Sequence, residues 1–354
     1  MRADLALVGF GNVARRFATL IEERRQRLVA DFDLDVRIVG IATRRHATAW
    51  NPNGLDAAQA IASLEAGGSL AALASDPPRD SLDLIARLGA SHSDLRVAIE
   101  TTVLDITAGQ PAVDHVRAAI AAGCHVVTAN KGPAAFAYAE LRDRAREAGV
   151  SFLFEGAVMD GIPIFNLVRE TLPVVDIVGF RGVVNATTNH ILSALEDGDE
   201  FAPALARMQQ LGIAEADPSL DVDGWDAAAK ASALANVLMG ARMTPQQVNR
   251  QGLDAGSADA ARRALAAGRR LRLVASAAKK SDGTIEANVA PVELPATDLL
   301  AGLRGQANAL VLNTDLLGEV AICQLDGSLT QTAYALLSDL VTIRQRAARA
   351  VPLR

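Results

Sequence analysis

Residues 9–14 form a glycine-containing turn between a predicted strand and a predicted helix. An apolar run at 5–9 predicts the strand, and apolar residues at helical spacing follow the turn. The turn reads G-x-G-x-x-A and consists of Gly9, Phe10, Gly11, Asn12, Val13 and Ala14. The first glycine permits a tight turn, the second permits close approach of the backbone to a ligand, and the small third residue lets the helix pack on the strand. This order predicts the start of a doubly wound α/β domain.

In such domains, the free N–H groups at the start of the helix bind the pyrophosphate of a dinucleotide. The alternative is a tight turn in a domain that binds no nucleotide. The predicted second strand, 36–42, ends without the acidic residue that NAD-selective folds use for the ribose, and Arg44 and Arg45 follow it. Guanidinium groups pair well with a 2′-phosphate, so we expect NADP unless these arginines are only solvated loop charges.

The rest of the chain predicts two further segments. Strand-like and helix-like runs alternate to about residue 150, as in a Rossmann-type parallel sheet covered on both faces. Residues 151–315 predict a second, α+β domain, and 316–354 predict a segment that returns to the first domain through an amphipathic helix at 332–347. In the second domain we expect strands at 174–184, 287–294 and 308–312, and helices at 201–211, 223–238 and 258–277.

Composition excludes several classes of protein. Half of the 354 residues are hydrophobic, and the net charge of −6 contains no long block of one sign, so neither a disordered chain nor a nucleic-acid partner is expected. Two distant cysteines, Cys124 and Cys323, suggest no disulfide framework. No secretory signal and no apolar run of about 18 residues occurs, so we expect a soluble cytoplasmic protein without a membrane partner.

Two stretches carry candidate chemistry. Lys131 follows a predicted strand at 125–128, at the edge where doubly wound sheets bind ligands, although an isolated lysine is more often a surface charge. Residues 215–226 contain five carboxylates in a loop that runs into a helix, where Asp226 and Lys230 stand four residues apart and share a face. Such a pair is often only an exposed salt bridge. The nearly uncharged helix around Lys230 instead predicts partial burial, which lowers the pKa of a lysine.

These segments resemble homoserine dehydrogenases over nearly the whole chain, in a short form without a C-terminal regulatory domain. The similar segments keep their order and spacing: GFGNV (9–13), TANKGP (128–133), EGAVMDGIPI (155–164), GVVNATTNHIL (182–192), LGIAEADPSLDVDGWDAAAK (211–230) and QANALVL (306–312). The resemblance implies an NAD(P)-dependent oxidoreductase that interconverts L-aspartate 4-semialdehyde and L-homoserine, a step toward threonine, methionine and isoleucine. It also implies a homodimer, and no direct feedback by threonine through a regulatory module.

The resemblance further implies site residues. Lys131 and Lys230 would flank the reacting carbon, with Lys230 as proton donor and Asp226 orienting it. Substrate would be bound by Glu215 and Asp221 at its ammonium group and by the lining residues Gly212 and Thr187. The cofactor would be bound by the glycine turn together with Arg44, Arg45, Thr101, Lys131 and Gly327. A monovalent cation, usually sodium in similar enzymes, would be held by Glu155, Val158, Asp160 and Ile162, a mixed oxygen set that suits a hard ion.

The sequence also departs from the family pattern. Ala186 stands where the family has glycine, and His190 stands where it often has tyrosine, which we interpret as a packing variant. The glycine-rich turn expected before the last helix is reduced to Gly327. These departures leave two alternatives open: a paralogous dehydrogenase for a related amino-acid semialdehyde, and a catalytically silent dinucleotide-binding sensor.

Overall fold

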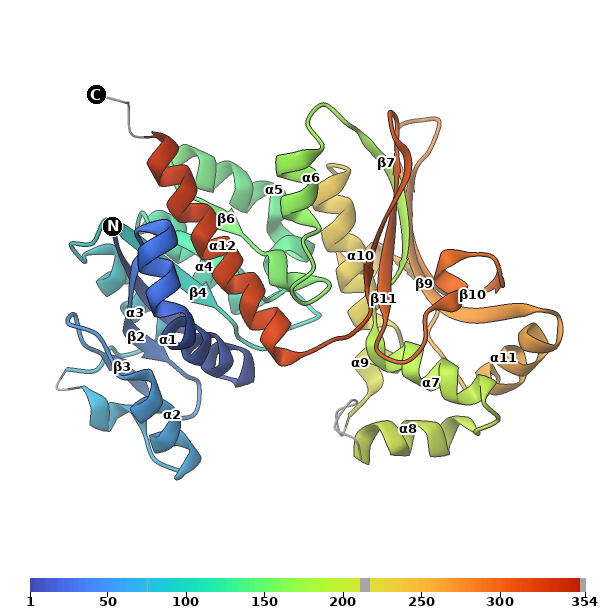
Figure 1. Cartoon of the computed structure of the whole chain (residues 1–354), viewed down its shortest axis with the longest axis horizontal. Helices are drawn as coiled ribbons and strands as arrows, with labels where there is room; N and C mark the ends of the chain where they lie inside the picture. The colour runs from blue at the N-terminus through green and yellow to red at the C-terminus, as the bar shows by residue number, and fades with distance from the viewer. Residues whose placement is uncertain (75, 211–216, 351–354) are drawn as a thin grey trace. The chain divides into compact units, whose positions relative to one another are not determined.

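A computed structural model describes residues 1–74, 76–210 and 217–350. The chain divides into two compact units. The first comprises 1–133, 137–163 and the segment from 328 onward, and the second comprises 134–136 and 164–327. Each unit contains its own six-stranded sheet (Figure 1). None of the described helices is long and apolar enough to cross a membrane.

The sheet of the first unit has the strand order β3-β2-β1-β4-β5-β6. Its pairs are parallel except for the edge pair β2/β3. The strands are β1 (Arg2–Val8), β2 (Asp35–Ala42), β3 (Thr48–Trp50), β4 (Leu95–Glu100), β5 (His125–Thr128) and β6 (Phe152–Leu153). The order reverses between β1 and β4, which is the switch point where doubly wound sheets bind ligands. The predicted fold class is confirmed.

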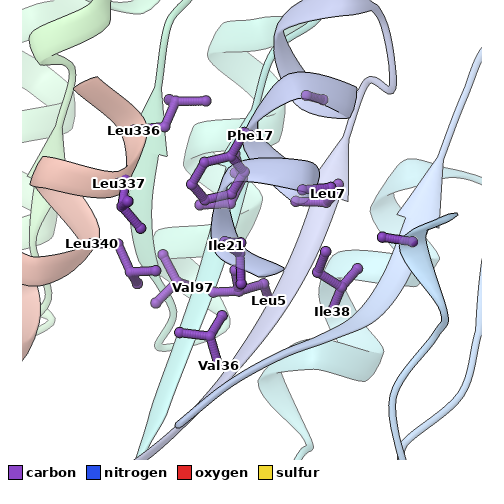
Figure 2. Close-up of a cluster of buried hydrophobic side chains, with 14 of the residues drawn as sticks. Leu5, Leu7, Phe17, Ile21, Val36, Ile38, Val97, Leu336, Leu337 and Leu340 are labelled. Carbon is purple, nitrogen blue, oxygen red and sulfur yellow. The ribbon is translucent and has the colours of Figure 1, made fainter. Parts of the chain in front are cut away.

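Apolar side chains from the helices and the sheet form the core of this unit (Figure 2). Phe17 and Ile21 of α1 lie among Leu5 of β1, Val97 of β4 and Leu336 of α12. Their spacing of four residues puts Phe17 and Ile21 on one helix face. The helical elements are α1 (Asn12–Phe32), α2 (Ala57–Glu65), η1 (Leu70–Leu73), α3 (Ser81–Gly89), α4 (Ala112–Ala121), α5 (Gly132–Glu147), η2 (Glu155–Ala157) and α12 (Leu329–Ala350).

The C-terminal helix α12 lies alongside α1 (Figure 1). It belongs to the first unit, whose last segment begins at residue 328, whereas the sequence predicts this segment from 316. Residues 318–324 instead form β12 of the second sheet. The first unit also continues past the expected boundary at 150, because β6 adds a further parallel strand next to β5.

The sheet of the second unit has the order β12-β11-β7-β9-β10-β8 and is antiparallel except for the pair β10/β8. Its strands are β7 (Ile177–Val183), β8 (Asn249–Arg250), β9 (Arg269–Lys279), β10 (Ile285–Pro295), β11 (Asn308–Thr314) and β12 (Gly318–Gln324). The helical elements are α6 (Phe165–Thr171), α7 (Ala186–Glu196), α8 (Phe201–Gln210), α9 (Ser219–Val222), α10 (Trp225–Leu238), η3 (Pro245–Gln247), α11 (Ser257–Ala266) and η4 (Leu299–Gly302). Helices α7, α10 and α11 contact this sheet.

The predicted helix at 258–277 is confirmed in its first half and wrong in its second. Helix α11 ends at Ala266, and Gly268 follows with a φ of +70°, a conformation that stops a helix. The remaining residues form β9, which pairs with β10 on one side and β7 on the other. The alanine-rich composition favours a helix locally, but the strand gains two hydrogen-bonded neighbours in the sheet.

A fully buried ion pair joins α7 to β9 in the second unit. The Arg272 Nη1 lies 2.7 Å from Glu196 Oε1, and both side chains are 0% exposed. Arg272 also donates to the carbonyl oxygens of Leu271 at 2.7 Å and Ala301 at 2.8 Å. A buried charge is tolerated only when it is paired and hydrogen-bonded in this way.

Candidate active site

The glycine turn has the geometry that a dinucleotide requires. Gly9 has a φ of +91° and donates to Ala42 at 2.9 Å, and a Cβ there would lie 2.8 Å from the backbone of Thr101. Gly11 precedes α1, and no heavy atom of the described residues outside the turn lies within 4 Å of where its Cβ would be. Ala14 is fully buried in the core. The turn therefore leaves its open side at Gly11, where a pyrophosphate can approach the backbone.

The other residues of the turn shape its surroundings. Asn12 and Val13 open α1, whose first turn carries no acidic side chain and no side-chain cap. The Arg15 guanidinium lies 5.9 Å from the centre of the Phe10 ring, and its Nε donates to the Phe10 carbonyl at 3.1 Å. The first-turn N–H groups and this neighbouring cation fit an anionic group.

Arg44 and Arg45 are both exposed in the loop that follows β2. The loop is shaped by Thr43, whose hydroxyl accepts from the His46 N–H at 2.8 Å. Strand β2 ends at Ala42, so no carboxylate occupies the position that binds a ribose in NAD-selective folds. Both arginines are available for a phosphate.

Lys131 follows β5 and is the N-cap residue of α5 in the first unit. It stands at the carboxyl end of the parallel sheet, next to the Thr101 loop that follows β4. The Thr101 hydroxyl donates to the Gly9 carbonyl at 3.0 Å. Thr101, Lys131 and the glycine turn therefore share one edge of this sheet.

Four polar side chains of the second unit form a compact cluster. The Lys230 Nζ lies 3.0 Å from Asp226 Oδ2, and it donates to the Val184 carbonyl at 2.6 Å. The Asn185 side-chain amide donates to Asp221 Oδ1 at 2.7 Å and to Asp226 Oδ2 at 2.8 Å. The cluster brings together the end of β7, the start of α7, and helices α9 and α10.

The two carboxylates of this cluster influence one another. Burial raises the pKa of Asp221 above its usual value, and the negative charge of Asp226 raises it further. Hydrogen bonds from Asn185 and Thr187 and the charge of Lys230 act in the opposite direction. A nearby cation, such as the ammonium group of an amino acid, would stabilise the ionised form of this buried carboxylate against the repulsion from Asp226.

The remaining predicted substrate residues divide into two groups. Thr187 is 6% exposed in the first turn of α7 and hydrogen-bonds to Asp221. Gly212 and Glu215 lie outside the described residues. Lys131 belongs to the first unit and Lys230 to the second, so their convergence on one carbon stays a prediction.

Ala186 and His190, the two departures from the family pattern in this region, both lie on α7. Ala186 begins the helix directly after Asn185, whose side chain caps it by accepting from the Thr188 N–H at 2.8 Å. Burial lowers the pKa of His190, which packs beside Gly305. This contact agrees with a packing role for the histidine.

The residues predicted to hold a cation lie in one loop between β6 and α6. Glu155 is 3% exposed, and its N–H donates to Asp339 of α12 at 2.8 Å. Asp160 has a φ of +47° and accepts from the Thr332 hydroxyl at 2.9 Å. Val158 is buried, and the Ile162 N–H donates to Met159 at 3.0 Å. Within 1–74, 76–210 and 217–350, no three His, Cys, Asp or Glu side chains gather as a metal site.

Gly327 ends the second unit, between β12 and α12. Just before it, the Gln324 side chain is 1% exposed and donates to the Asp326 carbonyl at 3.3 Å. The segment is therefore fixed at its start by β12, while the neighbouring Leu325 is 75% exposed.

Two residues at these sites, Asn185 and Glu100, are not predicted as functional from the sequence. Asn185 bridges Asp221 and Asp226, and Glu100 is buried at the end of β4. Asparagine before a predicted helix and a lone glutamate at the end of an apolar strand were the available signals. Neither signal indicates a partner that stands far away in the sequence.

Two family models match the chain. The one described as the NAD-binding domain of homoserine dehydrogenase matches residues 9–155, and the one described as homoserine dehydrogenase matches residues 163–341. The chain belongs to the homoserine dehydrogenase family.

Two relatives of this homoserine dehydrogenase family member are similar over nearly the full length of both chains. The NAD(+)-dependent homoserine dehydrogenase of Pseudomonas canavaninivorans is 38% identical, over 98% of this chain and 97% of the relative. The homoserine dehydrogenase of Methanocaldococcus jannaschii is 33% identical, over 96% of this chain and 98% of the relative.

Solved structures of homoserine dehydrogenases have the same fold. The enzyme from Thiobacillus denitrificans superposes with a TM-score of 0.81 at 29% identity, covering 99% of this chain and 76% of that one. A hyperthermophilic archaeal homoserine dehydrogenase in complex with NADPH superposes with a TM-score of 0.80 at 28% identity, covering 98% of each chain. An NAD(P)-binding domain in this family member agrees with the geometry at Gly9 and Gly11.

Proposed function

We propose that this protein is an NAD(P)-dependent oxidoreductase that interconverts L-aspartate 4-semialdehyde and L-homoserine. The observation that carries the proposal is the cluster of Asn185, Asp221, Asp226 and Lys230, which places one ammonium group beside two carboxylates on a largely buried surface. Such a cluster can bind the ammonium of an amino acid while it delivers a proton to a neighbouring oxygen. The family membership supports homoserine and its aldehyde as the substrate pair.

In this proposal Lys230 exchanges the proton. When bound, the nicotinamide supplies or accepts a hydride at the substrate carbon. Lys230 donates a proton to the aldehyde oxygen and accepts it in the reverse direction, because negative charge develops there. Asp226 and the Val184 carbonyl hold the Lys230 ammonium in place. Lys131, from the first unit, is proposed to stabilise the same oxygen.

The acidic residues are proposed to bind the substrate ammonium. Asp221 supplies one carboxylate, and its raised pKa reflects the cost of holding that charge without a cation. Glu215 is the second proposed carboxylate, and Gly212 and Thr187 are proposed to line the pocket. Asp221 and Thr187 are hydrogen-bonded to one another, which supports their assignment to one surface.

NADP is the proposed preferred cofactor, with Gly9 to Ala14, Thr101, Lys131 and Gly327 in its binding site. The support for NADP is the exposed pair Arg44 and Arg45 in place of a carboxylate after β2. A relative at 38% identity is named for its NAD(+) dependence, so NAD is the competing cofactor. We further propose a monovalent cation, sodium, in the loop of Glu155, Val158, Asp160 and Ile162.

We also propose a homodimer and a cytoplasmic location. Strand β12 is an edge strand of the second sheet, and the turn before it exposes Leu316 and Leu317 at 64% and 54%. Apolar side chains at a sheet edge favour association of subunits. Cys124 and Cys323 are both free thiols, which suits a reducing compartment.

The experiment measures reduced cofactor formed from L-homoserine at alkaline pH, with NADP and with NAD in parallel. Turnover with homoserine supports the proposal, and the ratio of the two kcat/KM values decides the cofactor. Turnover only with a homologue of homoserine would instead establish a paralogous dehydrogenase. Saturable binding of the dinucleotide without turnover of either alcohol would establish a sensor and contradict the proposed activity.

A further inference from the structure

The proposed reaction does not use Glu100, a buried carboxylate of the first unit. Glu100 is the last residue of β4 and is 1% exposed. It stands beside β1 and β5, at the carboxyl edge of the sheet that carries the glycine turn and Lys131. Burying a carboxylate costs free energy unless donors surround it, so its donors indicate what it holds in place.

Three donors, two from Thr102 and one from Thr128, reach the Glu100 carboxylate. Oε1 accepts from the Thr102 backbone N–H at 3.0 Å and also from the Thr102 hydroxyl. Oε2 accepts from the Thr128 hydroxyl at 3.0 Å. Thr102 lies after β4 and Thr128 ends β5, so the carboxylate connects the loops that follow two neighbouring strands. The imidazole of His115 lies behind it, with Nδ1 3.7 Å from Oε1.

Further hydrogen bonds link Thr128 and Thr102 to the residues on both sides of Lys131. The Thr128 hydroxyl accepts from the Asn130 N–H at 2.9 Å. The Asn130 side-chain amide donates to the Thr102 carbonyl at 2.9 Å, and its oxygen accepts from the Gly132 N–H at 2.8 Å. Glu100, Thr102, Thr128 and Asn130 thereby close a ring of hydrogen bonds, called here the Glu100 ring. Lys131 lies between Asn130 and Gly132, whose backbone N–H groups both donate hydrogen bonds to side chains.

The same carboxylate is joined to the glycine turn through its neighbour in the sequence. The Thr101 N–H donates to Val8 at 2.8 Å, and the Thr101 hydroxyl donates to Gly9 at 3.0 Å. Glu100 therefore lies where the loop that carries Lys131 meets the turn proposed to bind the dinucleotide.

We propose that Glu100 is a positioning residue, which acts through the Glu100 ring to hold Lys131 in a fixed relation to the Gly9 turn. This inference rests on the proposed function, in which Lys131 acts at the reacting carbon. A carboxylate suits the task because it only accepts, and the Thr102 N–H and the hydroxyls of Thr102 and Thr128 all donate to it. A displacement of about 1 Å at a catalytic group is enough to cost on the order of 100-fold in rate, so a rigid ring has a direct effect on turnover.

The test compares Thr128→Val with Thr314→Val in the full-length protein. Both threonines are buried, and each hydroxyl donates to an oxygen and accepts from a backbone N–H: Thr314 donates to Gly318 and accepts from Leu317, both at 2.9 Å. Thr314 lies at the end of β11 and has no part in the proposed site. Two quantities are measured: kcat for homoserine oxidation, and hydrogen–deuterium exchange of the amides of residues 129–132.

We expect Thr128→Val to speed exchange at Asn130 and Gly132 and to lower kcat about 10- to 100-fold. Its affinity for the dinucleotide should change less than threefold. Thr314→Val should leave both measurements near wild type, and Thr128→Ser, which keeps the hydroxyl, should restore both. Should Thr128→Val fail to fold, Asn130→Ala breaks the same ring and takes its place.

Faster exchange with unchanged kcat, or no difference between the two valine variants, would overturn the positioning role. A wild-type protein that does not turn over homoserine would contradict the proposed function instead. In that case the exchange comparison still decides whether the ring fixes the Lys131 loop: unchanged exchange in Thr128→Val overturns the inference, and faster exchange supports it.

Discussion

Lys230 and Asp226 lie one helical turn apart on α10, with Nζ 3.0 Å from Oδ2, and each side chain is only 14% exposed. A pair at this spacing is usually a solvated salt bridge of small effect. Here the ammonium also donates to the Val184 carbonyl, and the carboxylate also accepts from Asn185. Polar groups of α10 and of the β7–α7 connection therefore hold this one lysine in place, which favours the catalytic role proposed for it.

Lys230→Ala should lower kcat for homoserine oxidation by at least about 100-fold, because the homoserine hydroxyl loses the group that accepts its proton. Dinucleotide affinity, measured by fluorescence titration, should stay within twofold of wild type. The matched control is Lys280→Ala, since Lys280 also pairs with a carboxylate, Glu286 at 2.6 Å, but is 53% exposed. A kcat near wild type in Lys230→Ala would remove Lys230 from its proposed role.

Asp221→Asn should raise the KM for homoserine and raise the Tm at pH 7. The folded protein holds the pKa of Asp221 above its usual value, so it binds the proton more readily than the unfolded chain does. The ionised carboxylate therefore destabilises the fold at neutral pH, and the amide removes that cost. The gain should disappear as the pH falls below about 4, the ordinary range for an aspartate, where both states of the wild type are protonated.

Asp217→Asn serves as the control for this pH dependence. Hydrogen bonds from Ser219 hold the pKa of Asp217 below its usual value, which is the opposite direction. Its replacement should give no gain in Tm at pH 7, since the ionised form is the favoured one there. Thermal scans between about pH 3 and pH 8 compare the two variants across the ordinary titration range of an aspartate, and equal behaviour would contradict the environment described for Asp221.

Gly9→Ala should abolish dinucleotide binding, whereas Gly54→Ala should not. Both glycines have a positive φ, +91° and +107°, so both substitutions carry a conformational cost on the order of 1 kcal/mol. Only at Gly9 would the new Cβ lie 2.8 Å from the backbone of Thr101; at Gly54 no described heavy atom lies within 4 Å. Titration with NADP measures the difference, and tight binding by Gly9→Ala would show that the turn is not the site.

Arg272→Met should destabilise the protein by about 3–5 kcal/mol, because it leaves Glu196 buried with its closest partner removed. The matched control is Arg27→Met, which removes an exposed partner of Asp31 on α1. Urea unfolding measures both variants, and the control should stay close to wild type. A small effect in Arg272→Met would mean that Arg270, 3.0 Å from Glu196, replaces the lost partner.

Local pattern predicted the features that depend on near neighbours in the sequence. The turn at Gly9, the start of α1 and the shared face of Asp226 and Lys230 all follow from spacings of two to five residues. The same reliance on local pattern failed at 258–277, where an alanine-rich composition favoured a helix and the pairing of β9 with two strands produced a sheet.

Contacts between distant segments were decided only by the tertiary structure. Asn185 stands 36 and 41 residues from the two carboxylates that it bridges, and Glu100 stands 28 residues from Thr128. No periodicity links such positions, because they meet only once parallel strands align their carboxyl ends and helices pack on a sheet. The sequence by itself thus determined which chemical groups the protein carries. The folded topology determined which of these groups form hydrogen bonds and ion pairs with one another.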